Sequence, residues 1–527
     1  MHQKTRRARL TMAFAALSAA ALTLSACSVT TEEPASDQSM VVDLSFAMTT
    51  LDPAKAFDVS ASFVLSQVYE TLTRYEPGDS EVSPSLAESW EVSDDATEYT
   101  FALKPGVTFS TGAAMTSADV VFAFNRLKNI QDSPAYLMDG LTVTAEDDLT
   151  VKIVSETPLP QLPSMLTSMN FGVYDSAAAK EIGATDAPDA ATSDTSGTGF
   201  DTASFGSGPY EITRYEPNSQ VGLEYNDTFL GDEPTFTTVV FQNTTSTQQQ
   251  LLNVQNGGSQ VALNIPSTQL AQLDESKVDI QSQPLPQVVY IALSNTIGAT
   301  HNADYREAVA LGIDYDGLVS IGGPGTVQAT GVIPSTLAGA LPESAATTRD
   351  LEGAKAALER SGLASEPLVI SFGSDYVVGG VDMSALAQKV QSSLEEVGFT
   401  VTLDGAPTQV SRTANQQGLV GAAMWPFPPD YPDASQFLIY QPDGLLGTRI
   451  HWTAAEAPEI AALGEAAQSE VSGEARVEAF QKWGEALNAE HRFIPLVTMP
   501  TNLVVAKGIT GLNVDINGTT YLDLLGN

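Results

Sequence analysis

The sequence contains few of the side chains that commonly carry enzyme chemistry or bind metals. It has one cysteine in 527 residues, so it cannot form an internal disulfide. Only three histidines lie beyond residue 26 (His301, His451 and His491), and they form neither an HExxH pair nor a close cluster. The motifs GxSxG, SxxK, GxGxxG and GxxxxGK[ST] are also missing. We therefore expect no catalytic residues, no metal site and no cofactor.

Basic residues are scarce as well. The 24 Lys and Arg stand against 64 Asp and Glu, which gives a formal charge of −40. A chain this acidic is not expected to bind the phosphate backbone of a nucleic acid. We interpret the acidity as solvated surface carboxylates, with a preference for a cationic ligand as the alternative. Beyond the N-terminus, no apolar run approaches the 18 residues of a membrane span.

The N-terminal segment predicts an export signal with a lipid anchor. Four basic residues, Lys4 to Arg9, precede an uncharged stretch from Thr11 to Ala26. This pattern is typical of a signal peptide. Leu24-Ser25-Ala26-Cys27 resembles a bacterial lipobox, in which the cysteine thiol is lipidated and becomes the mature N-terminus. We expect a lipoprotein signal peptide at 1–26, lipidation of Cys27 and a polar tether at 27–39.

The first half of the mature chain mixes strands and helices. We predict a strand at 40–48, a helix at 60–72 and a hairpin at 89–109 that turns at Asp94-Asp95-Ala96-Thr97. Thr116 and Asp119 have the spacing of a capping box at the start of a helix. Residues 182–205 are small, polar and acidic, so we interpret them as a surface insertion with little structure.

The second half predicts an α/β fold more plainly. A strand at 367–372 is followed by a helix that Ser384 could cap and Gly398 ends, and then by a strand at 399–403. A strand, a helix and a second strand joined by such short connections imply that the two strands are parallel, in a sheet covered by helices. A long helical stretch at 456–490 precedes another strand at 493–497. About 490 mature residues exceed one ordinary core, so at least two lobes are expected.

Several segments resemble one family, the extracytoplasmic solute-binding proteins of ABC importers in the peptide/oligopeptide/nickel class (family 5). They run in the family's order, from residue 51 to the C-terminal FIPLV: LDPAKA (51–56), VYETL (68–72), PSLAESWEVSDDATEYTFALKPGVTFSTG (84–112), MTSADVVFAFNRL (115–127), GSGPYEI (206–212), HNADYREAVALGIDYDGLV (301–319), SLEEVGFTVTL (393–403) and DYPDASQFL (430–438). We expect most residues in these segments to pack in the core and not to contact a ligand, as for Trp90 and Phe101 in the hairpin.

The resemblance implies a type II periplasmic-binding-protein-like fold, with two α/β lobes, a ligand cleft and an extra N-terminal subdomain. The large lobe would be 40–58, 200–286 and 492–527, the extra subdomain 59–199 and the second lobe 287–491. Two hinge crossings would lie near residues 284–287 and 491–493. Lobe closure around a solute would be the signal that a permease reads.

The segment MWPFPPDYPDASQFL (424–438) is the best candidate for ligand contact. Its aromatic residues Trp425, Phe427 and Tyr431 lie among prolines, and Asp430 matches the acid that pairs with the peptide amine in peptide-binding members. The alternative for Asp430 is a turn residue bonded to its own backbone. Tyr376 lies in the loop 373–380, where dipeptide-binding members carry a basic residue for the C-terminal carboxylate. This loop has no Lys or Arg, so a longer peptide or another solute is favoured over a free dipeptide.

The expected function is therefore capture of a peptide or peptide-like solute by a lipid-anchored monomer on the extracytoplasmic face of a bacterial cell membrane. Its partners would be the ABC permease subunits with their cytoplasmic ATPase, and it would bind no nucleic acid. A nickel or metal-chelate receptor stays open, because His451 could reach the cleft. A peptide sensor without transport also stays open, as does, more distantly, a secreted hydrolase.

Overall fold

The computed structural model describes residues 38–527, apart from 47, 264 and 472. The chain separates into two units, Met1–Ser39 and Met40–Asn527, and the fold below is that of the second unit. The predicted signal peptide, Cys27 and nearly all of the tether lie outside the described residues. Among the described helices, none is both long and apolar enough to cross a membrane.

The first of two large sheets has seven strands in the order β12-β21-β11-β1-β10-β9-β8. β1 pairs with β11 in parallel, and β11 pairs with β21 antiparallel. Helix α8 (Thr247–Asn256) covers β11 and β21 with Leu251 and Val254. The strands are β1 (Ser39–Leu44), β8 (Tyr210–Glu216), β9 (Gln220–Tyr225), β10 (Thr238–Asn243), β11 (Val261–Leu263), β12 (Val278–Pro284) and β21 (Pro500–Ala506).

The second sheet has six strands in the order β14-β20-β13-β19-β15-β18. β15 and β18 pair in parallel, so the predicted strand–helix–strand unit is confirmed. The strands are β13 (Val288–Leu293), β14 (Val327–Gln328), β15 (Leu368–Gly373), β18 (Val401–Ala406), β19 (Ala422–Phe427) and β20 (Phe493–Thr498).

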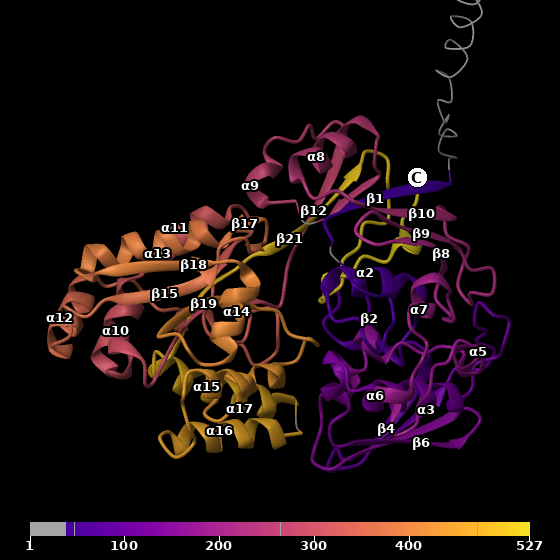
Figure 1. The fold of residues 1–527 in the computed structure, drawn as a ribbon, viewed down its shortest axis with the longest axis horizontal. Coiled ribbons are helices and arrows are strands. Elements are labelled where there is room, and N and C mark those ends of the chain that lie inside the picture. Colours follow the sequence, from indigo (N-terminus) through magenta and orange to yellow (C-terminus); the bar gives the residue numbers. More distant parts are fainter. Residues whose placement is uncertain (1–37, 47, 264, 472) are drawn as a thin grey trace, which may run out of the picture. The chain divides into compact units, whose positions relative to one another are not determined.

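Helices cover both faces of the second sheet (Figure 1). All six residues of β13 are buried, and they alternate: Val289, Ile291 and Leu293 join one core, whereas Tyr290 and Ala292 join the other. This alternation follows from the two-residue period of a strand that is buried on both faces. The first core is closed by α10 (Ala303–Gly312), α11 (Tyr315–Gly322), α12 (Leu351–Ser361) and α13 (Met383–Val397), and the second by α15 (Leu445–Arg449), α16 (Pro458–Ser469) and α17 (Gly473–Ala489).

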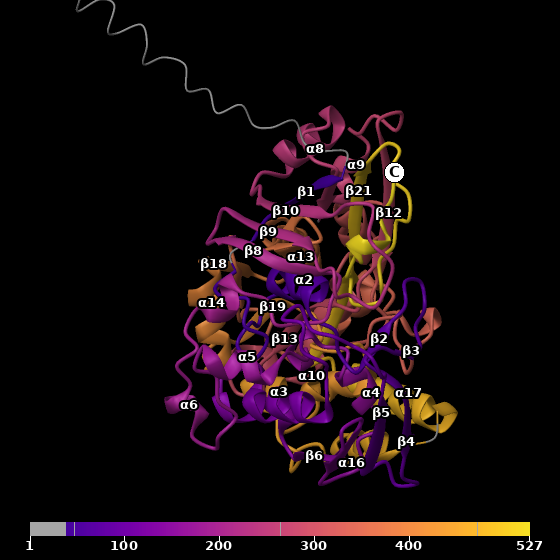
Figure 2. The same cartoon turned by 90° about the vertical axis from the view of Figure 1, so that its right-hand side faces the viewer.

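The N-terminal part adds a four-stranded antiparallel sheet in the order β4-β5-β7-β6. The predicted hairpin is formed by β4 (Ala87–Val92) and β5 (Glu98–Leu103), with Phe101 fully buried and 6.0 Å from the ring of Trp90. Figure 2 shows α3 (Ser117–Ile130) beside the strands of this sheet, where it packs on β6 (Leu141–Asp147) and β7 (Thr150–Ser155). Nearby elements are α2 (Val59–Val68), β2 (Thr73–Tyr75), β3 (Val82–Pro84), α4 (Leu162–Met165), α5 (Ser176–Glu181), α6 (Ala190–Ser193) and α7 (Gly199–Thr202).

The predicted helix ends are mostly confirmed. The carboxylate of Asp119 accepts a hydrogen bond from the Thr116 backbone N–H at 2.9 Å, which completes the capping box of α3. Gly398 ends α13 with a φ of 116°, a left-handed conformation that glycine adopts without strain. The prediction that Ser384 caps this helix is wrong: Asp382 occupies the N-cap position, and the Ser384 hydroxyl donates to the Ser374 carbonyl.

The two large sheets are joined by two passages of the chain. The first runs from β12 to β13 through residues 284–288, as expected. The second differs from the expectation, because β20 pairs with β13 and β14 and so belongs to the second sheet. The chain therefore leaves that sheet at Met499, between β20 and β21, and not near residues 491–493. The division into lobes and subdomain is otherwise kept as a proposal.

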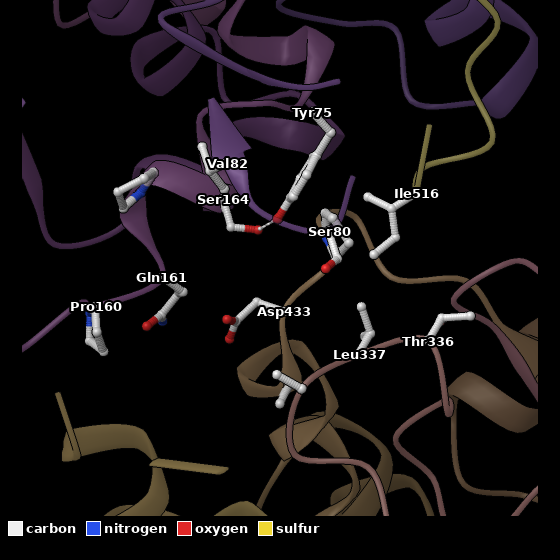
Figure 3. A pocket seen from close by; sticks show the side chains of 14 residues that line it. Tyr75, Ser80, Val82, Pro160, Gln161, Ser164, Thr336, Leu337, Asp433 and Ile516 are labelled. Atoms are coloured by element: carbon white, nitrogen blue, oxygen red, sulfur yellow. Dashed lines mark hydrogen bonds between the residues drawn. The ribbon is translucent and has the colours of Figure 1, made fainter. Parts of the chain in front are cut away.

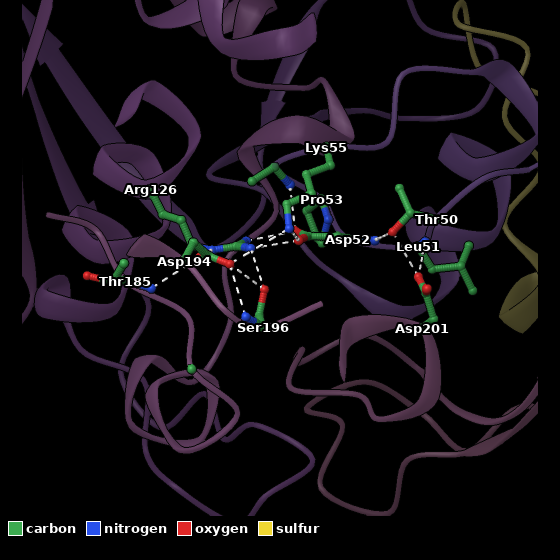
Figure 4. Close-up of polar contacts among 12 residues, drawn as sticks. Thr50, Leu51, Asp52, Pro53, Lys55, Arg126, Thr185, Asp194, Ser196 and Asp201 are labelled. Carbon is green, nitrogen blue, oxygen red and sulfur yellow. Dashed lines mark hydrogen bonds and ion pairs between the residues drawn. The ribbon is translucent and has the colours of Figure 1, made fainter. Parts of the chain in front are cut away.

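The predicted helical stretch at 456–490 is confirmed, and it consists of two helices, α16 and α17. One further prediction is wrong. Residues 182–205 are not an unstructured insertion, because Phe200 is fully buried and Asp194 accepts a hydrogen bond from the Nε of buried Arg126 at 2.8 Å (Figure 4). The small polar residues of this segment are held in place by partners that are distant in the sequence.

Candidate ligand site

Strand β19 brings Trp425 and Phe427 to one end of the second sheet. Tyr290 pairs with Trp425, and Val288 pairs with Phe427, so both aromatic residues lie near the start of β13, beside the first passage between the sheets. Trp425 is 6% exposed and its ring lies 5.9 Å from that of Tyr376, in an edge-to-face arrangement. The structure thus brings together two of the predicted site residues, Trp425 and Tyr376.

Phe427 and Tyr431 are held mainly by packing. The ring of Phe427 lies 5.5 Å from that of Phe437 and 5.8 Å from that of Tyr440, within the core closed by α15 to α17. Tyr431 is 8% exposed and joins the hydrophobic core of the N-terminal part, where burial raises the pKa of its hydroxyl to about 12. These contacts anchor the two ends of the 428–431 loop.

Asp430 lies between those two anchors, and its carboxylate reaches a residue 294 positions away in the sequence. It accepts a hydrogen bond from the hydroxyl of Tyr136, which belongs to the 3₁₀ helix η1 (Ser133–Met138) of the N-terminal part. The Asp430 backbone N–H donates to the side-chain oxygen of Gln436 at 3.2 Å. The carboxylate that bonds to the backbone of its own turn is that of Asp433, which caps the next 3₁₀ helix and accepts a hydrogen bond from the Ser435 N–H at 2.8 Å.

The electrostatic state of Asp430 follows from its surroundings. Burial raises the pKa of its carboxyl above the ordinary value, and the Tyr136 hydrogen bond opposes that shift. Burial and the charge of Asp430 in turn raise the pKa of Tyr136. Among the described residues, no cation forms an ion pair with Asp430, although the ordinary partner of a sheltered carboxylate is a cation.

Tyr136 and its neighbour Phe57 are candidate site residues that the sequence analysis missed. They are 41% and 46% exposed, and their rings lie 6.4 Å apart, edge to face. Neither residue has a sequence signal that would reveal this role, because both occur in short apolar segments that look like ordinary packing. Tyr136 reaches Asp430 through a contact between distant parts of the chain, and Phe57 packs against Tyr136.

Arg412 is a third residue that the sequence analysis missed. It lies on α14 (Thr408–Gln416), and its guanidinium carbon is 6.0 Å from the centroid of the Trp425 ring. A guanidinium near an aromatic face is attracted by the ring quadrupole. Trp425 therefore has Tyr376 and Arg412 as neighbours.

His451 lies away from this group. Its side chain is exposed, and its Nε2 is 2.9 Å from the Gly418 carbonyl oxygen. Asn295, just beyond the far end of β13, donates to the His451 carbonyl at 3.2 Å, whereas Phe427 pairs with the first residue of the same strand. Within the described chain, no group of three or more His, Cys, Asp or Glu is placed to hold a metal ion.

A cavity of about 280 Å³ is lined on one side by residues of the N-terminal part, among them Tyr75 and Gln161, and on the other by the segments 336–338 and 432–434 (Figure 3). The Tyr75 hydroxyl and the Ser164 hydroxyl in its wall are hydrogen-bonded at 2.8 Å. The carboxylate of Asp433, also in the wall, is bound by Arg476 at 2.8 Å. The Asp433 carboxylate in the cavity wall is thus already paired with a cation, and none of the predicted site residues lines the cavity.

Comparison with known proteins gives the chain a family. The model for "Bacterial extracellular solute-binding proteins, family 5 Middle" matches residues 81–444, more than half of the chain. The "Probable D,D-dipeptide-binding periplasmic protein DdpA" of Escherichia coli K12 is 28% identical over 423 residues, which cover 78% of this chain and 79% of that protein. The "Dipeptide-binding protein" of the same organism is 28% identical over 320 residues, 56% of this chain and 58% of that protein.

Solved structures share the fold over almost the whole chain. The ABC transporter substrate-binding protein CtaP of Listeria monocytogenes has a TM-score of 0.81 at 18% identity, with 94% of this chain and 99% of that chain covered. The periplasmic binding protein DppA of Helicobacter pylori, in complex with the peptide STSA, has a TM-score of 0.75 at 17% identity, with 92% and 98% covered. The predicted type II periplasmic-binding-protein-like α/β fold is confirmed. The chain belongs to the bacterial extracellular solute-binding proteins of family 5.

Proposed function

We propose that this protein is the substrate-binding component of an ABC importer and captures a peptide or peptide-like solute whose amino end binds Asp430. Family membership supports the general role, and the relatives named for dipeptide binding support the ligand class. The protein would act as a monomer that closes its lobes on the solute and delivers it to permease subunits with a cytoplasmic ATPase.

The observation that carries the ligand proposal is the bonding of Asp430. Its carboxylate is partly buried, and its partner in the described structure is the neutral hydroxyl of Tyr136. A ligand ammonium would supply the missing positive charge and form a charge-assisted hydrogen bond. Such a bond contributes about 1.5–3 kcal/mol. The exposed rings of Phe57 and Tyr136 would provide apolar contact beside the amine.

The test is a double cycle of binding measurements by calorimetry. Asp430→Asn keeps the shape of the side chain but removes its charge, so it should weaken binding of a free-amine tripeptide by about ten- to a hundredfold. N-acetylation of the peptide should cost the wild type a similar factor. The same acetylation should cost the Asp430→Asn protein much less, because both changes delete one interaction.

Asp433→Asn is the matched control, because the Asp433 carboxylate is already bound by Arg476. Acetylation should weaken binding to this variant as much as binding to the wild type. If the losses from Asp430→Asn and acetylation simply add, the ligand amine is held elsewhere and the assignment of Asp430 is wrong.

We also propose that Cys27 is lipidated and tethers the protein to the outer face of the cell membrane, on the basis of the lipobox-like LSAC sequence. Cys27→Ala should leave a folded protein that is unprocessed or shed into the medium. Fractionation of cells followed by mass spectrometry checks this. A variant that is cleaved and still membrane-bound would contradict the anchor.

A further inference from the structure

Two arginines stand out by their lack of acidic partners. Among the arginines that the structure describes, Arg412 and Arg449 have neither an ion pair nor a side-chain hydrogen bond. This is unexpected in a chain with 64 acidic and 24 basic residues, where a carboxylate is available for almost every cation. The other eight described arginines are all paired: Arg74, Arg126, Arg214, Arg306, Arg349, Arg360, Arg476 and Arg492.

Arg412 lies beside the candidate ligand site, and its charge also acts on Arg449. Burial lowers the pKa of Arg449 most, and the positive charge of Arg412 lowers it further. The charge of Arg412 also opposes the rise in the pKa of Tyr376 that burial causes. The guanidinium carbon of Arg412 lies 6.0 Å from the centroid of the Trp425 ring, which in turn packs edge to face against the ring of Tyr376. Arg412 is exposed and Arg449 is half-buried, and a ligand anion would offset the repulsion between their charges.

Trp425 adds an independent observation. Its side chain is 6% exposed, and its indole Nε1–H has no hydrogen-bond acceptor among the described residues. An indole N–H can only donate, and a buried donor without a partner costs about 1–3 kcal/mol. The unpartnered donor on Trp425 and the two free guanidiniums would all be satisfied by a ligand group rich in acceptor atoms.

The loop at 373–380 is linked to the helix that carries Arg412. The Asp375 carboxylate of that loop accepts a hydrogen bond from the Thr408 N–H, the first residue of α14, at 2.7 Å. Arg412 follows Thr408 by four residues, one helical turn later. Helix α14 thus carries a positive charge beside a loop that has none of its own.

We propose that Arg412 and Arg449 form an anion subsite beside Trp425 and Tyr376 that binds a carboxylate of the ligand. Guanidinium groups suit this role, because they bind carboxylates with two parallel hydrogen bonds. The inference rests on the proposed function and narrows it: the solute carries an amine for Asp430 and a carboxylate for the arginine pair. The carboxylate is either the C-terminus of a peptide or an acidic side chain.

Calorimetry with three peptides tests the subsite and identifies the source of the carboxylate. The peptides are trialanine, its C-terminal amide and the amide of Ala-Glu-Ala. Amidation of trialanine should weaken binding to the wild type by about ten- to a hundredfold. It should have little effect on Arg412→Gln combined with Arg449→Gln. Full recovery with Ala-Glu-Ala amide would assign the subsite to a side-chain carboxylate, and no recovery would assign it to the C-terminus.

The control variant is Arg360→Gln, whose guanidinium is exposed and paired with Asp304 and Glu307. It should behave as the wild type does. If amidation costs the arginine double variant as much as it costs the wild type, the subsite is overturned while the peptide-binding function stands.

A direct probe separates failure of the subsite from failure of the proposed function. Succinate should change the tryptophan fluorescence of the wild type, because Trp425 lies beside Arg412, and this change should be lost in the double variant. If no peptide binds but the succinate response depends on the arginines, the subsite stands and the proposed peptide function fails. If neither succinate nor any peptide gives an arginine-dependent signal, the subsite is wrong.

Discussion

Arg126 shows how much one residue can depend on distant partners. Its side chain is fully buried, and its two terminal nitrogens donate to the two carboxylate oxygens of Asp52 at 2.7 and 2.6 Å, while its Nε donates to Asp194. Removal of one member of a buried ion pair leaves an uncompensated charge and typically costs about 3–5 kcal/mol. We expect Arg126→Met to lower the free energy of unfolding by that amount, measured by urea denaturation.

An exposed pair provides the control, and acid unfolding provides a second measurement. Arg214→Met breaks the surface pair with Glu216 and should cost about 0–1 kcal/mol. Burial raises the pKa of Asp194, but its bonds to Arg126 and Ser196 outweigh burial and lower the pKa to about 2. The stability from Asp194 is therefore complete above its ordinary pKa of 3.8 and is lost as the pH falls through about 2. Arg126→Met should unfold at higher pH than the wild type. Equal acid midpoints would contradict this.

At the scale of elements, the cap of α3 has a second role that its motif does not reveal. One carboxylate oxygen of Asp119 accepts from the Thr116 N–H, and the other accepts from the Ser176 N–H at the start of α5 at 3.0 Å. Asp119 therefore links the beginnings of two helices. We expect Asp119→Ala to cost about 3–6 kcal/mol, since each of the two hydrogen bonds to this charged group contributes about 1.5–3 kcal/mol. The measurement is a urea titration followed by circular dichroism.

Asp350→Ala is the matched variant for this prediction. Asp350 caps α12 alone, through a bond from the Gly353 N–H at 2.9 Å, and it is exposed. Loss of a simple cap costs about 1 kcal/mol. Equal losses in the two variants would show that the bond to α5 adds nothing to stability.

At the scale of the whole molecule, two chain passages join the two large sheets, at residues 284–288 and at Met499. Two such passages could act as a hinge, and a ligand that contacts both sides would stabilise the closed form. We expect a saturating tripeptide to reduce the radius of gyration in solution scattering and to raise the melting temperature. At a hundredfold excess over Kd the added stability is about 2.7 kcal/mol.

The Asp430→Asn protein at the same peptide concentration should show smaller changes in radius of gyration and in melting temperature, because a smaller fraction of its sites is occupied by peptide. A scattering curve that stays the same while calorimetry shows full occupancy of the wild type would contradict lobe closure.

Local patterns in the sequence are enough to predict several of the short-range elements and the family. The turn of the 89–109 hairpin, the capping box of α3 and the end of α13 at Gly398 depend on residues within a few positions of one another, so their patterns are visible in the chain. The apolar stripe of α13 at Leu386, Val390, Leu394 and Val397 is buried as its spacing predicts. Short-range geometry fixes all of these features. The order of the family segments identified the fold, because that order is a property of the sequence.

The contacts between distant segments cannot be predicted from such patterns, because they depend on tertiary packing. β20 looks like any buried strand, and its pairing with β13 places it in the second sheet. Residues 182–205 read as polar and unstructured, because their partner Arg126 lies more than fifty residues away. The sequence marks Asp430 as a candidate, but its bond to Tyr136 spans 294 residues. No local pattern distinguishes Arg412 and Arg449 from the other described arginines, all of which have ionic partners. Such contacts depend on chain reversal and burial, which leave no local pattern in the sequence.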